Sequence, residues 1–114
     1  MTPTQAAVFL EEYAARLDRG GHELWHGESI PVRKDTVAFH ELAGQIRHMA
    51  RGVRFHSRNI ALLERHAARL RRINEPLMRR DVAEPTRQEA ILAVGSAVQL
   101  EQISTWISRM TGEW

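Results

Sequence analysis

The sequence contains no cysteine, and all but one of its sixteen basic residues are arginine. Without cysteine, disulfides, thiolate nucleophiles and cysteine-ligated zinc or iron–sulfur centres are excluded. A chain that uses no disulfides fits a reducing compartment, so we expect a cytoplasmic location. The preference for arginine over lysine suggests a bacterial or phage genome rich in GC, which concerns codons rather than function.

Long apolar runs are also missing. The longest apolar stretch without a charge covers positions 90–100, which is eleven residues, whereas a membrane-spanning helix needs about 20. The amino terminus has no basic segment followed by an apolar one, so no export signal is expected. The 114 residues, 43% hydrophobic and 26% charged, are typical of one globular domain over 1–114, with no membrane partner.

Apolar residues recur at helical spacing in three segments and predict an all-α fold. The first helix is expected at about 5–19, capped by Thr4 and ended by Gly20 and Gly21. A loop at 20–34 follows, and a second helix is expected at about 36–75, because no proline occurs between Asp35 and Pro76. A third helix is expected at about 87–111.

The second segment carries a heptad pattern along its whole length. With Phe39 as the first a position and Leu42 as the first d position, ten of the twelve a and d positions up to Leu77 are apolar, the exceptions being His56 and Asn74. This pattern predicts a central helix of about 40 residues, about 60 Å long, with a coiled-coil-like seam in an antiparallel three-helix arrangement. The seam is expected to pack against the other two helices, with self-association along it as the alternative. His56 is expected either to fix the register or to make an interface sensitive to pH.

The first half of the third segment is apolar on nearly all sides. The other two predicted helices cannot cover all of these sides, so apolar surface is expected to remain exposed. We therefore expect a homo-oligomer or docking onto a protein partner. The residues assigned to this interface are Ile60, Leu63, Leu70, Ile91, Val94 and Val98.

Charge is distributed unevenly, with net charges of −3, +8 and −3 over 1–46, 47–80 and 81–114. Arginines of the basic middle fall opposite the apolar seam, where they predict a site for nucleic acid or for an acidic partner. Phe55 and Leu62 are expected beside this stripe, where an exposed ring would stack on a base. The alternative is a solvated face whose charges pair with the acidic ends. The arginines of this candidate site are Arg47, Arg51, Arg54, Arg58, Arg65, Arg69 and Arg72.

One short segment matches a sequence motif of zinc hydrolases. His22, Glu23 and His26 match H-E-x-x-H, in which the two histidines bind zinc and the glutamate is the general base. Glycines on both sides leave barely one helical turn, so we expect no metal site and no zinc enzyme here.

Taken together, these patterns predict a small non-enzymatic helical interaction protein without a cofactor. It would self-associate and dock on a macromolecular partner as an adaptor, regulator or inhibitor. The alternative is a nucleic-acid-binding subunit that grips the phosphates of DNA or RNA with the arginine stripe.

Overall fold

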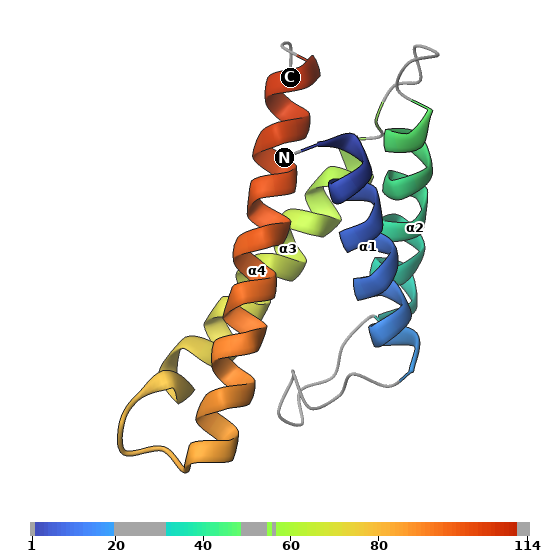
Figure 1. Ribbon diagram of the computed structural model, residues 1–114. Helices are drawn as coiled ribbons and strands as arrows, with labels where there is room; N and C mark the ends of the chain where they lie inside the picture. Colours follow the sequence, from blue (N-terminus) through green and yellow to red (C-terminus); the bar gives the residue numbers. More distant parts are fainter. Residues whose placement is uncertain (1, 20–31, 49–54, 56, 112–114) are drawn as a thin grey trace.

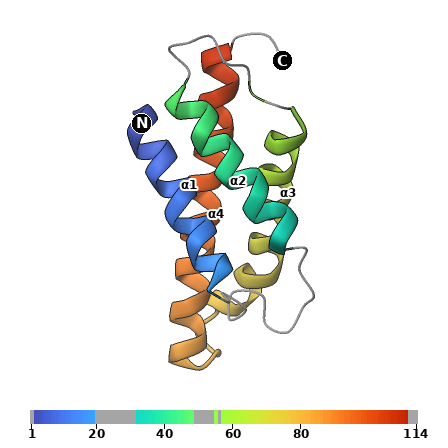
Figure 2. The ribbon, with the colours of Figure 1, turned by 90° about the vertical axis from the view of Figure 1, so that its right-hand side faces the viewer.

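The computed structural model describes residues 2–19, 32–48, 55 and 57–111 (Figure 1). Over these residues the chain is all-α and has no strand. Its elements are α1 (Pro3–Asp18), α2 (Val32–Arg47), α3 (Ser57–Asn74), the short 3-10 helix η3 (Glu75–Met78) and α4 (Glu84–Thr111). Successive α-helices run in opposite directions (Figures 1 and 2).

The predicted central helix of about 40 residues is wrong, and so is the three-helix arrangement that depended on it. The segment forms two helices, because α2 ends at Arg47 and α3 begins at Ser57. In one continuous helix Phe39 and His66 would lie about 40 Å apart. In the structure their ring centroids are 5.0 Å apart, so the chain folds back and lets both halves of the apolar seam share one core.

The first and last helices lie within three residues of their predicted bounds. α1 begins with a capping box two residues earlier than expected, with Thr2 rather than Thr4 as the N-cap. The backbone N–H of Gln5 donates to the Thr2 hydroxyl, and the Thr2 N–H donates to the Gln5 side chain. At the end of α3, the Asn74 side chain donates to the Leu70 carbonyl, and Pro76 follows in η3. The predicted loop ends earlier than expected, since α2 begins at Val32; positions 20–31 lie outside the described residues.

The core draws on all four α-helices. The seam residues that the structure describes are buried with one exception, half-buried Leu77, and the buried ones are Phe39, Leu42, Ile46, Ile60, Leu63, Ala67, Leu70 and Asn74. His56 lies outside the described part of the chain. The heptad pattern thus identified core residues correctly although they lie on two helices.

The helices form two hairpins, which we call the N-terminal hairpin (α1 and α2) and the C-terminal hairpin (α3, η3 and α4). Packing is most extensive within each hairpin, and α2 against α3 is the main join between them. Both ribbon views show the beginning of α4 projecting beyond the ends of α1 and α2 (Figures 1 and 2). This projecting part of α4 therefore has fewer neighbours than the rest of the molecule.

Candidate functional site

One side of α4 is turned away from the core along the whole helix. The opposite side packs inward through six buried apolar residues: Ala90, Ala93, Ala97, Leu100, Ile103 and Ile107. The outward side, which we call the α4 outer face, consists of Glu84, Gln88, Ile91, Gly95, Val98, Gln102, Thr105 and Arg109. All eight are exposed except Val98, which is half-buried. Their spacing alternates between four and three residues, so they form one continuous stripe.

The middle of the α4 outer face is apolar and open. Ile91 is 41% exposed, and its neighbour Leu92 is 62% exposed. A Cβ built at Gly95 would meet no atom within 4 Å apart from its chain neighbours and the backbone of its own helix. Further along the stripe lies a groove of about 580 Å³, lined by Val98, Glu101, Gln102, Thr105, Trp106 and Arg109. A helix from elsewhere has room to approach closely at the glycine and to place side chains in the groove.

Charge on the α4 outer face is confined to its two ends, with Glu84 at the beginning and Arg109 at the end. The Glu84 carboxylate accepts hydrogen bonds from the side chains of Gln88 and Arg87. The Gln88 hydrogen bond, followed by the charge of Arg87, holds the pKa of Glu84 below its usual value. The face therefore carries a stabilised negative charge at one end and a positive charge at the other.

Half of the residues assigned to an interface from the sequence lie in the core instead. Ile60, Leu63 and Leu70 are at most 9% exposed and pack inside the bundle. Ile91 is exposed, and Val94 and Val98 are half-buried on α4. Any interface that uses the predicted residues is therefore built on α4 alone.

The predicted arginine stripe is divided between the two hairpins. Arg51 and Arg54 lie outside the described residues. Arg47 ends α2, and its guanidinium donates twice to the Glu11 carboxylate, with both N–O distances 2.9 Å. These hydrogen bonds raise the pKa of Arg47 and lower that of Glu11. Arg47 therefore ties α2 to α1.

The remaining arginines of the predicted site lie on α3. Arg58, Arg65 and Arg72 are exposed, and Arg69 beside them is half-buried. Arg69 and Arg72 make further interactions within the chain. The expectation of an exposed stacking ring is wrong, because Phe55 is 5% exposed and Leu62 is 7% exposed. The α3 surface thus presents cations without an aromatic platform.

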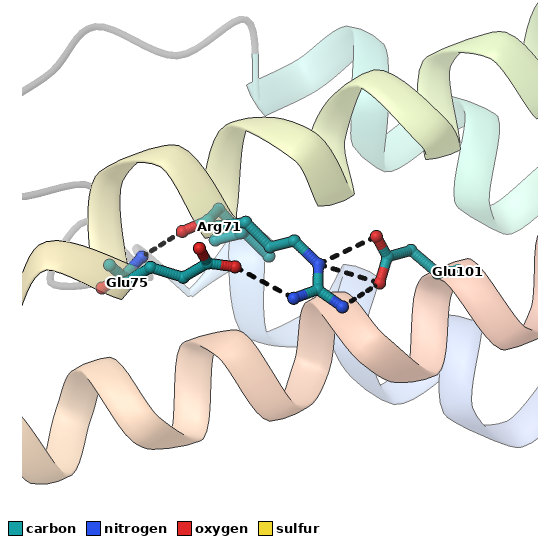
Figure 3. A network of polar contacts seen from close by, with 5 residues as sticks. Arg71, Glu75 and Glu101 are labelled. Atoms are coloured by element: carbon teal, nitrogen blue, oxygen red, sulfur yellow. Dashed lines mark hydrogen bonds and ion pairs between the residues drawn. The ribbon is translucent and has the colours of Figure 1, made fainter. Parts of the chain in front are cut away.

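Arg71 has a structural role that the sequence analysis did not identify. Its guanidinium donates to Glu101 on α4 and to Glu75 in η3 (Figure 3). The Glu101 hydrogen bonds, followed by the Glu75 hydrogen bond, raise the pKa of Arg71. The i to i+4 spacing of Arg71 and Glu75 was a visible signal, whereas the pairing with Glu101 depends on how α3 packs against α4.

A buried polar network also escaped the sequence analysis, and it crosses three helices. His66 on α3 bonds through Nδ1 to the Asp35 carboxylate of α2 and through Nε2 to the Tyr13 hydroxyl of α1, each at 2.8 Å. The rings of Tyr13 and Phe39 pack edge-on against the imidazole. Burial raises the pKa of Tyr13 above its usual value. The position of His66, one residue before the seam residue Ala67, was the only available signal.

This network is buried, and both ring nitrogens of His66 are hydrogen-bonded within it. The adjoining cavity of about 110 Å³ is lined by Asp35, Leu62, Arg65, His66 and Arg69, and the His66 side chain is 0% exposed. The arrangement joins the two hairpins.

The proposed zinc motif cannot be placed, because His22, Glu23 and His26 lie outside the described residues. Within 2–19, 32–48, 55 and 57–111, no cluster of three or more metal-ligating side chains occurs. In the same ranges, none of the helices has the length and apolar character that crossing a bilayer requires.

Comparison with known proteins gives no relative, since no protein-family model, curated protein or solved structure matches the chain.

Proposed function

We propose that this protein is a small helical interaction protein that self-associates through the α4 outer face and docks on a protein partner as an adaptor, regulator or inhibitor. The observation that carries the proposal is the uncharged, partly apolar stripe between Glu84 and Arg109, in which Ile91 is 41% exposed, together with the adjacent Leu92, which is 62% exposed. Contiguous exposed apolar surface of this kind typically marks an interaction site.

Three features support α4 over other surfaces. The beginning of α4 projects beyond the N-terminal hairpin (Figures 1 and 2), so it is accessible to a second molecule. Gly95 lies near the middle of the stripe and lets another backbone approach. The groove beside Trp106 offers a recess for side chains of that molecule. The proposal involves no cofactor and no catalysis, and it retains the cytoplasmic location expected from the sequence.

Light scattering over a range of protein concentrations tests the proposal. The unmodified chain is expected to form a dimer, and Ile91→Glu is expected to abolish it, because the carboxylate would be desolvated in the interface. Val37→Glu is the matched control, since Val37 is 48% exposed but lies on α2. Circular dichroism should show unchanged helicity in both variants. A monomeric unmodified chain at every concentration would refute the proposal.

A nucleic-acid-binding function is the second candidate, favoured by the shared exposed side of Arg58, Arg65 and Arg72 on α3. If these side chains contact phosphates, affinity for duplex DNA falls with rising salt by about 0.9 logarithmic units per contact. Replacing Arg58 and Arg65 with Ala should then lower that slope by about two contacts. Replacing Arg79 and Arg80 with Ala removes the same charge elsewhere and serves as the control. An unchanged slope would rule out the α3 surface as the DNA site.

A further inference from the structure

We infer that the occupant of the α4 outer face is a second copy of the same helix running antiparallel, with Glu84 of each copy beside Arg109 of the other. This inference rests on the proposed function and goes further, because it specifies direction and register. It is carried by the spacing of the stripe, by the position of its two charges and by the place of Gly95 near its centre.

The spacing of the stripe is that of a coiled coil. Steps of four and three residues give an average period of 3.5, and this period keeps a stripe facing one partner helix over several turns. The stripe from Glu84 to Arg109 is about 38 Å long. The core side of α4 satisfies the packing within this chain through Leu100, Ile103 and Ile107. The outward stripe is therefore a second seam on the same helix, with Ile91 and Val98 as its aliphatic side chains. No helix of its own chain lies opposite it among the described residues.

An antiparallel copy brings the positions of this seam together in pairs. A two-fold axis passing between Ser96 and Ala97 places each residue opposite the one at equal distance on the other side. The resulting pairs are Glu84 with Arg109, Gln88 with Thr105, Ile91 with Gln102 and Gly95 with Val98. Every position of the seam then faces a seam position of the other copy, as an isologous interface requires.

The charges select this direction over the parallel one. In a parallel pair at equal register, Glu84 would face Glu84 and Arg109 would face Arg109, so both ends would repel. In the antiparallel pair both ends attract, and the helix macrodipoles also oppose one another. At the centre, Gly95 leaves space for the Val98 side chain of the other copy, since a Cβ there has no neighbour within 4 Å.

Site-directed cross-linking tests whether the two helices run antiparallel. Because the chain has no native cysteine, only the introduced thiols can form disulfides. Two single variants, Ile91→Cys and Gln102→Cys, are prepared with tags of different size and treated with a glutathione redox buffer, separately and mixed. In the antiparallel pair, two copies of position 91 lie about 16 Å apart, beyond the roughly 7 Å limit for Cα atoms in a disulfide. We therefore expect a covalent dimer in the mixture and none in either variant alone.

Three results would overturn the inference in distinguishable ways. Covalent dimers of Ile91→Cys alone would indicate a parallel pair. A dimer in solution that gives no cross-link in the mixture would place the interface on another surface, while leaving self-association intact. A chain that is monomeric throughout would remove the proposed function together with the inference.

Charge exchange provides an independent test of the register. Glu84→Lys and Arg109→Glu are each expected to weaken the dimer about tenfold at low salt, because each places two like-charged pairs at the ends. The double variant restores opposite charges across both ends and should recover most of the affinity. Arg87→Ala is the control, because it removes the intrachain partner of Glu84 without altering the seam charges. A double variant as weak as the single variants would contradict the register.

Discussion

Replacing His66 by leucine should destabilise the protein more than any other single change considered for this chain. The imidazole is 0% exposed and bonds to a Tyr13 hydroxyl and an Asp35 carboxylate that are themselves buried. In the leucine variant neither group keeps its partner. A buried hydroxyl without a hydrogen bond costs about 1–3 kcal/mol, and leaving a buried carboxylate without its partner costs about 3–5 kcal/mol.

The expected loss of folding free energy for His66→Leu is therefore about 4–6 kcal/mol, taking the lower half of the summed range because Asp35 retains 7% side-chain exposure. A domain of this size has about 5–15 kcal/mol in total, so the variant should be close to unfolding. The matched control is His40→Leu. His40 pairs with Asp18 at 3.7 Å, but these side chains are 49% and 58% exposed, and the expected loss is within about 0.5 kcal/mol.

Urea denaturation followed by circular dichroism measures both values. Tyr13→Phe should give an intermediate loss of folding free energy, because it removes the hydrogen-bond partner of only one ring nitrogen of His66. The double variant Tyr13→Phe, His66→Leu should lose less folding free energy than the two single variants lose together, because no Tyr13 hydroxyl remains to be buried without a partner. If His66→Leu falls within about 1 kcal/mol of the unmodified chain, the network does not hold the hairpins together.

Three further predictions concern ionisation and helix packing. Tyr13 is the only tyrosine, and its raised pKa means that the folded state holds the phenolic proton more firmly than the unfolded state does. The free energy of unfolding should therefore fall as pH rises above the usual pKa of 10.0. Tyrosinate absorbance should appear together with the loss of helical circular dichroism. The lowered pKa of Glu11 contributes stability above the usual value of 4.5 that disappears as pH falls through the lower folded pKa. In Glu11→Gln that acid-dependent part of the denaturation midpoint should be absent, whereas a midpoint curve identical to that of the unmodified chain would contradict the Arg47 pairing. Gly95→Ala and Gly44→Ala should each raise stability by about 0.5–1 kcal/mol, because neither Cβ meets an atom within 4 Å, but only Gly95→Ala should alter dimer affinity in light scattering.

The sequence predicted the helical class and the buried positions, but it did not reveal the turn between α2 and α3. Ile46 and Ile60 are two heptads apart, so both fit one seam whether the chain continues or folds back. Periodicity reports which face is apolar and does not report the direction of the next segment. Gly52, which lies between the two helices in the sequence, was the available signal, because glycine weakens a helix interior.

The candidate site was harder to predict, because it depends on which side of α4 remains uncovered. Its first half is apolar nearly all round, so the sequence alone could not separate core residues such as Ala93 from exposed ones such as Leu92. The polar members of the outer face, Gln88 and Gln102, look like ordinary surface residues until the core side is known. Likewise, the pairing of Arg47 with Glu11 spans thirty-six positions and follows only from the contact between α1 and α2.

The two hydrogen bonds of His66 also bear on the order in which the protein folds. The bond between His66 and Tyr13 spans 53 positions, more than the 36 between Glu11 and Arg47 within the N-terminal hairpin. Local contacts close quickly, and long-range contacts require more chain to be ordered first. Both hydrogen-bond partners of the imidazole belong to the N-terminal hairpin. They can therefore bond together to the C-terminal hairpin only after α1 and α2 have packed against each other. Separation of the two hairpins therefore has to break both of these bonds and exposes the buried Tyr13, Asp35 and His66 side chains to water.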